Sequence, residues 1–119
     1  MDYVRVKATV INPGNPSIKA DVELLADTGA VFTLISKNRL AELGVKPVEK
    51  MTFTGINGES LIRDVGAAYL QVEDRKWLTS IIFGEEKDTE VLGVTTLEQL
   101  GLQVDPIDMK IKPLPLYLL

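Results

Sequence analysis

The alternation of apolar and polar residues predicts a chain built mainly of short β-strands. Residues 3–11 and 18–24 place an apolar side chain at every second position, as expected for strands with one buried face. Between them, residues 12–16 (Asn-Pro-Gly-Asn-Pro) favour a turn, because proline and glycine interrupt regular structure. Together these segments predict a hairpin that leads the chain to residue 27.

Two apolar runs, Val22–Ala26 and Val31–Ile35, flank the polar triplet Asp27-Thr28-Gly29. This order predicts a sharp turn between two buried strands. A carboxylate near apolar surroundings is unfavourable without a partner or a task, because burial favours its neutral form. Asp27 is therefore the first candidate for a functional residue, and the alternative is a plain turn, for which Asp, Thr and Gly are ordinary residues.

A second hairpin is expected in the middle of the chain. Residues 49–54 and the run from 59 to 72 have the character of strands, and Gly55-Ile56-Asn57-Gly58 lies between them. Asn-Gly is a strong signal for a tight hairpin turn. Taken by itself, this pattern describes an ordinary surface hairpin.

Two short helices and further strands complete the pattern. One helix is expected over residues 37–43, after Ser36 as N-cap, and a second before Gly101, where Thr95 and Glu98 have the spacing of a capping box. The remaining expected strands are residues 77–83, 104–106 and 109–111. The apolar tail, residues 114–119, must be covered either by its own core or by a second subunit.

Composition narrows the possible functions. The 119 residues, 45% apolar and 25% charged, are typical of one globular domain spanning residues 1–119. A net charge of −4 without a basic cluster predicts neither a nucleic-acid partner nor an anionic membrane surface. We expect a cytoplasmic protein, because the N-terminus lacks the pattern of a signal peptide and no apolar run could span a bilayer.

The chain contains no histidine and no cysteine. It therefore cannot form a Ser-His or Cys-His pair, a disulfide or a zinc site of the usual kind. We expect no metal and no cofactor, so chemistry must come from carboxylates, hydroxyls, lysines and the backbone.

The order of apolar run, Asp27-Thr28-Gly29-Ala30, apolar run and helix resembles the active-site loop of aspartic proteases. Ala30 after the glycine resembles the retroviral-type, retropepsin-like branch. The second motif of that family resembles Val91-Leu92-Gly93 and the helix after it, so the resemblance covers roughly residues 2–113. It implies an all-β fold, a closed sheet or barrel with one or two short helices that equals half of a pepsin-like enzyme. It also implies that a side chain at position 93 would collide with the catalytic loop.

By this resemblance, the protein is an aspartic endopeptidase that acts on a peptide or protein substrate. Aspartic proteolysis needs two carboxylates that share one proton, and the chain has one Asp-Thr-Gly. A homodimer that places Asp27 against its own copy is therefore implied. Thr28 would join the two loops across the axis, and Gly29 would direct its N–H to the carboxylate.

The resemblance assigns the second hairpin to the flap, the mobile hairpin that closes over bound peptide. Substrate-binding residues would then be Ala30, Thr54, Gly55, Ile56, Asn57 and Gly58. Pepsin-like enzymes usually carry a hydroxyl residue at the position of Ala30. Because that hydrogen bond would favour the charged carboxylate, its absence predicts activity nearer to neutral pH than that of pepsin.

Two other classes of function compete with this interpretation. A non-catalytic dimeric peptide-binding module could use the same fold, since fold alone does not establish activity. Such a module has no need for a pair of buried carboxylates, which argues against it. Asp27 as a metal ligand or phosphoryl nucleophile is disfavoured, because no second Asp stands two residues on and no phosphate-binding glycine loop is adjacent.

Overall fold

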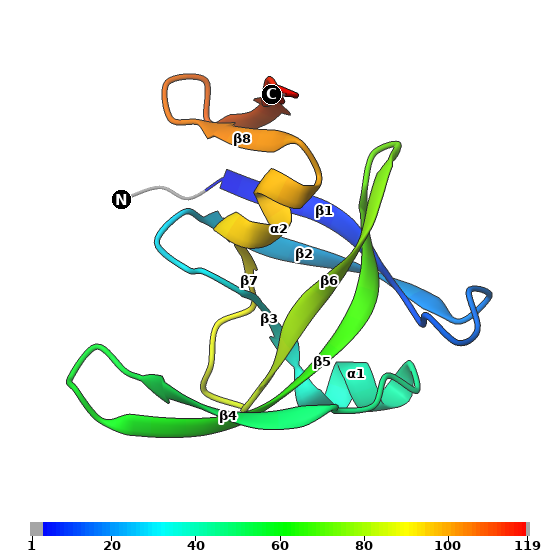
Figure 1. Cartoon of the computed structure of the whole chain (residues 1–119), viewed down its shortest axis with the longest axis vertical. Coiled ribbons are helices and arrows are strands. Elements are labelled where there is room, and N and C mark those ends of the chain that lie inside the picture. Colours follow the sequence, from blue (N-terminus) through cyan, green and yellow to red (C-terminus); the bar gives the residue numbers. More distant parts are fainter. Residues whose placement is uncertain (1–3, 119) are drawn as a thin grey trace.

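The computed structural model describes residues 4–118 and consists mainly of β-strands with two short helices (Figure 1). The first strand was expected to begin at Tyr3, which lies outside the described residues. The strands are β1 (Val4–Ile11), β2 (Lys19–Asp27), β3 (Thr33–Ser36), β4 (Glu49–Thr54), β5 (Ser60–Val72), β6 (Arg75–Gly84), β7 (Val91–Gly93), β8 (Leu102–Asp105) and β9 (Lys110–Pro113). The helices are α1 (Lys37–Glu42) and α2 (Val94–Gln99).

Six strands form a closed barrel in the order β1-β2-β7-β3-β6-β5. Pairing of β1 with β5, where Thr9 lies opposite Gln71 and Ile11 opposite Tyr69, closes the circle. Strand β4 adds to the far side of β5, and β8 pairs with β9 in a separate small sheet. The predicted all-β closed sheet with short helices is confirmed, and closure leaves few open strand edges, which are otherwise prone to aggregation.

The barrel interior is filled by the alternate side chains that the apolar pattern predicted. Val10, Leu24, Leu70, Ile81 and Leu92 come from five different strands and have no exposed surface. Helices α1 and α2 each add one buried leucine to the same core. Each fully buried aliphatic side chain contributes about 1.5–3 kcal/mol relative to exposure, so the core is the main stabilising term.

Helix α2 begins differently from the prediction. The expected capping box of Thr95 and Glu98 is absent, and the N-cap is Gly93, which has no side chain to donate or accept a hydrogen bond. Instead, the N–H groups of Val94 and Thr95 donate to the carbonyls of Ala30 and Val31, at 2.8 and 3.1 Å. The first turn of α2 is therefore capped by the loop that follows β2.

The last two strands also lie elsewhere than expected. Strands were predicted at residues 104–106 and 109–111, and the structure places them at Leu102–Asp105 and Lys110–Pro113. The reason is Asp105, whose carboxylate accepts the N–H groups of Ile107 at 2.9 Å and Asp108 at 3.2 Å. This turn ends β8 one residue before Pro106.

The apolar tail is not covered by the core of its own chain. Its first residue, Leu114, donates its N–H to the carbonyl of Gly101 at 2.8 Å. Beyond it, the side chains of Leu116, Tyr117 and Leu118 are 69%, 85% and 102% exposed. Docking on the chain's own core is therefore wrong for these three residues, and the position of Leu119 lies outside the described residues.

The turn at Asp105 leads to a prediction about stability in acid. The N–H groups of Asp108 and Ile107 and the ammonium of Lys112 lower the pKa of Asp105 to about 2. A carboxyl with a lowered pKa stabilises the folded chain above its unfolded pKa of about 4, and this contribution is lost as pH falls toward about 2. Asp105→Asn keeps the acceptor oxygen and loses the charge.

We expect wild type to unfold at a higher temperature than Asp105→Asn at about pH 7, and the gap to close between about pH 4 and pH 2. Thermal unfolding followed by circular dichroism at several pH values measures this gap. A gap that stays constant down to about pH 2 contradicts the prediction.

Candidate active site

Asp27 is the last residue of β2 and is half-buried. Strand β2 runs parallel to β7, and Asp27 lies opposite Gly93 in their register. The chain then turns sharply, because the N–H of Ala30 donates to the carbonyl of Asp27 at 3.1 Å. Within this turn the N–H of Gly29 donates to Asp27 Oδ1 at 2.9 Å, while Thr28 and Gly29 are exposed. The carboxylate is thus oriented by its own loop.

Gly93 lies against the loop after Asp27 so closely that no side chain fits. A Cβ atom at this position would lie 2.4 Å from the carbonyl carbon of Phe32 and 2.6 Å from its oxygen. These distances are far inside van der Waals contact with backbone atoms, which cannot move aside. The crowding that was expected at position 93 is therefore present, and it explains why glycine is needed there.

A chain of buried hydroxyl groups joins β3, β6 and α2 next to Gly93. Thr33, Thr79 and Thr96 are at most 2% exposed, and Thr96 Oγ1 lies 2.7 Å from Thr33 Oγ1 and 2.8 Å from Thr79 Oγ1. Thr33 Oγ1 accepts the N–H of Gly93, and Thr79 Oγ1 donates to Gln99 Oε1. Because both ends are fixed, each hydroxyl donates one bond and accepts one. Sequence analysis missed this network: the apolar surroundings of Thr33 and Thr79 in strands were a signal that each is buried, but nothing linked them to Thr96 of α2.

The β4–β5 hairpin carries the predicted substrate-binding residues 54–58 at its tip. Gly55 donates to the carbonyl of Glu59 at 2.8 Å, and Gly58 has a φ of +82°, which favours glycine. Ile56 at the tip is fully exposed. In Figure 1 this tip and the loop between β2 and β3 project from the same side of the barrel.

The structure brings the hairpin and the loop between β2 and β3 together through aromatic rings rather than through the tip. Phe53 of β4 packs edge-on against Phe32, with ring centroids 6.4 Å apart. Such edge-to-face pairs contribute about 0.5–1.5 kcal/mol beyond their buried area. Among residues 4–118, no hydrogen bond joins residues 54–58 to residues 27–30.

A cavity of about 230 Å³ opens beside Asp27 and is lined by Leu25, Asp27, Thr89 and Val91. A larger hollow of about 820 Å³ lies elsewhere, among charged side chains of β1 and β2, and contains none of the predicted site residues. The smaller cavity is the candidate site because it includes the carboxylate. Thr89 and Val91 were not predicted as site residues, although Val91 begins the motif Val91-Leu92-Gly93 and Thr89 stands two residues before it.

The part of the chain that the structure describes, residues 4–118, has no group of three or more acidic side chains that could hold a metal ion. Within the same residues, no helix has both the length and the apolar character to cross a membrane.

The buried hydroxyl network leads to a prediction about stability. Thr96→Val removes the hydroxyl at its centre, which leaves the buried Thr33 hydroxyl without an acceptor and the buried Thr79 oxygen without a donor. We expect the free energy of unfolding in urea to fall by about 1–3 kcal/mol. Thr52→Val, on the exposed face of β4, is the control and should stay within about 0.5 kcal/mol of wild type. Equal effects of the two substitutions would contradict a role for the network.

Comparison with known proteins agrees with this geometry. The model of a family described as gag-polyprotein putative aspartyl protease matches residues 18–99. No curated protein matches the chain. The matched span covers more than half of the chain and includes Asp27, the β4–β5 hairpin and Gly93. The chain therefore belongs to the gag-polyprotein putative aspartyl protease family, a family of retropepsin-like domains.

Proposed function

We propose that the chain is an aspartic endopeptidase that cleaves peptide bonds as a homodimer. The observation that carries the proposal is the position of Asp27 at the end of β2, oriented by the Gly29 N–H and bordering a cavity. This arrangement presents a carboxylate to a bound molecule, while the parallel pairing of β2 with β7 holds the backbone of Asp27. Family membership supports protease chemistry at that carboxylate.

One chain supplies one Asp-Thr-Gly, and the reaction needs two carboxyl groups. A two-fold axis close to the catalytic loop would bring Asp27 of both chains together. Two features support an association surface on this chain. Val31, in the catalytic loop, is an apolar residue with 58% of its surface exposed, and the apolar tail residues Leu116–Leu118 lie open to solvent. Exposed apolar side chains of this kind are typical of subunit contacts.

The two Asp27 carboxyl groups would share one proton and titrate as a coupled pair. The charged member takes a proton from a water molecule, which then attacks the peptide carbonyl carbon. The protonated member donates its proton to the peptide oxygen. As the C–N bond breaks, the carboxyl that took the proton from water passes it to the leaving amine, and the other carboxylate takes a proton back from a hydroxyl of the intermediate. Thr28 would link the two loops through its hydroxyl. The Gly29 N–H would keep the Asp27 carboxylate oriented toward the water molecule and the peptide bond.

The peptide would lie between the catalytic loop and the β4–β5 hairpin. Residues 54–58 would then contact its backbone, with the glycines at 55 and 58 allowing close approach. Ala30 would face the substrate from the loop side. Leu25 and Val91 give the cavity beside Asp27 apolar walls, which suits an apolar side chain next to the cleaved bond.

Asp27→Asn tests the proposal directly, because asparagine is nearly isosteric and cannot act as acid or base. We expect cleavage of a mixed peptide library to fall about 10²- to 10⁴-fold, with dimer and fold retained. Asp21→Asn, on the exposed face of the same strand, is the control and should keep wild-type activity. Product analysis by mass spectrometry and sedimentation of each variant provide the measurements.

Wild type that sediments as a dimer and cleaves no peptide would contradict the protease and favour the alternative, a non-catalytic dimeric peptide-binding module. Peptides retained by the immobilised dimer would then identify its ligand.

The pH profile is a second test. Ala30 provides no hydroxyl to hydrogen-bond the carboxylate. The charged form is favoured less than in pepsin-like enzymes, so we expect optimal cleavage above about pH 3.5. Cleavage rates measured from about pH 3 to pH 8 check this, and an optimum below that value would contradict it.

A further inference from the structure

The segment between β6 and β7, residues 85–90, belongs to no strand, and its backbone makes few hydrogen bonds. Asp88 donates its N–H to the carbonyl of Glu85 at 3.0 Å, and the carbonyl of Glu90 accepts the N–H of Leu25 at 3.4 Å. The segment nevertheless leads straight to the cavity beside Asp27. Its position therefore depends on side chains, and two arginines from other elements bind it.

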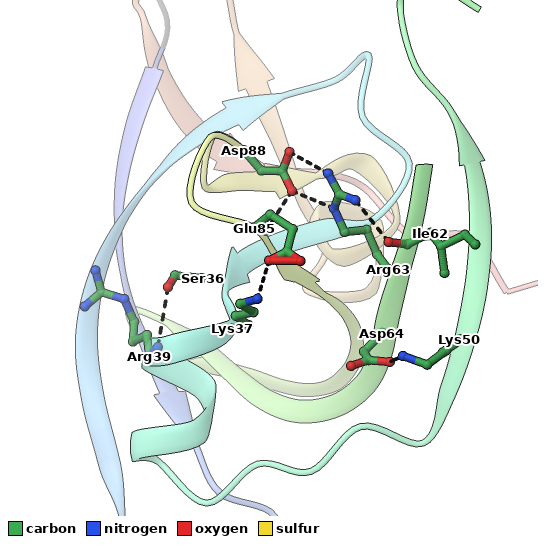
Figure 2. Close-up of polar contacts among 9 residues, drawn as sticks. All are labelled: Ser36, Lys37, Arg39, Lys50, Ile62, Arg63, Asp64, Glu85 and Asp88. Atoms are coloured by element: carbon green, nitrogen blue, oxygen red, sulfur yellow. Dashed lines mark hydrogen bonds and ion pairs between the residues drawn. The ribbon is translucent and has the colours of Figure 1, made fainter. Parts of the chain in front are cut away.

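The first arginine is Arg63, on strand β5. Its Nε and Nη2 atoms donate to the two carboxylate oxygens of Asp88 at 2.7 and 3.1 Å, and Asp88 also accepts the N–H of Glu85 (Figure 2). The two side chains are only 11% and 17% exposed. The hydrogen bond from Arg63 is the main cause that lowers the pKa of Asp88, so the pair stays charged in mild acid.

The second arginine is Arg39, in helix α1. Its Nε and Nη2 atoms donate to the carboxylate of Glu90 at 3.2 and 3.3 Å. Glu90 also accepts the N–H of Ser36 at 3.0 Å. Paired two-point bonds of this kind fix direction as well as distance, which a single lysine ammonium does not do.

Residues that bind arginine alternate here with residues that line the cavity. Asp88 and Glu90 are held by Arg63 and Arg39, while Thr89 between them and Val91 after them line the cavity beside Asp27. A displacement of either carboxylate would therefore move a wall of that cavity. Arg63 is the more informative of the two arginines, because it stands on an arm of the β4–β5 hairpin.

We propose that Arg63 is a positioning residue: it fixes the cavity wall formed by Thr89 and Val91 and couples that wall to the β4–β5 hairpin. The inference rests on the proposed function, in which the cavity receives a substrate side chain and the hairpin closes over the peptide. Closure of the hairpin then sets the shape of the cavity through the Arg63–Asp88 pair. Arg63 acts on selectivity and substrate affinity, and it takes no part in the proton transfers.

The chain offers a matched control on the same hairpin. Lys50 of β4 pairs with Asp64 of β5 at 2.8 Å, next in sequence to Arg63, and no hydrogen bond or ion pair joins this pair to residues 85–90 (Figure 2). Lys50→Met removes a hairpin salt bridge without touching the cavity wall. Arg63→Met removes both hydrogen bonds to Asp88, and Arg63→Lys keeps the positive charge in case Arg63→Met fails to fold.

The first measurement is hydrogen–deuterium exchange of residues 85–88, which needs no substrate. The amides of Glu85 and Asp88 report on the segment, because both are hydrogen-bonded within it. We expect their exchange to be about 10-fold faster in Arg63→Met, less accelerated in Arg63→Lys and unchanged in Lys50→Met. Unchanged exchange in both Arg63 variants would overturn the proposal, whether or not the protein cleaves peptides.

The second measurement uses peptides that differ in the size of the side chain next to the cleaved bond. In the Arg63 variants we expect KM for the preferred peptide to rise about 10-fold, kcat to stay within about 2-fold and discrimination by size to weaken. A loss confined to kcat, or a selectivity identical to wild type, would overturn the proposal. Wild type without any cleavage overturns the proposed protease instead, and the exchange measurement then decides the role of Arg63.

Discussion

The parallel pairing of β2 with β7 is the constraint on which the rest of the site depends. It sets Asp27 opposite Gly93 and brings the start of α2 against the loop that follows Asp27. Contact at this distance leaves room for glycine only, and the carbonyls of Ala30 and Val31 replace the missing helix cap. The pairing of β2 with β7 thus places the carboxylate and determines where the helix begins.

Local sequence signals predicted the strands, the hairpins and the turn at Asp27-Thr28-Gly29 because each depends on neighbouring residues. Alternation along β1 and β2 follows directly from one face being buried, and Asn57-Gly58 marks its turn by backbone preference. The failures share a different cause. Thr95 and Glu98 have the spacing of a capping box, yet the first-turn N–H groups of α2 are already bound by residues far away in the sequence.

The same limit applies to the site. Thr33, Thr79 and Thr96 bind one another only after three separate elements have packed, so no local pattern reveals that they form one network. Arg63 and Asp88 stand 25 positions apart in the sequence, and no local pattern links them. Their low exposure is a property of the folded barrel and is invisible in composition. Residues at the motif could be found from sequence, whereas the residues that support them could not.

The buried hydroxyl groups have a structural role, whereas the partly buried Asp27 carboxylate is the group proposed to carry out the chemistry. Asp27 was expected at a buried strand end, but within one chain it borders an open cavity. The polar groups buried near it are neutral threonine hydroxyls, which need no counter-charge. A single chain therefore avoids the desolvation of an ionised carboxylate, which is large in apolar surroundings. In the proposed mechanism, a second chain would supply the low-dielectric setting in which two carboxyl groups share a proton. In the proposed dimer, association provides a second Asp27 and also removes water from the first one. The catalytic state of the carboxyl pair would therefore form only when the two subunits associate.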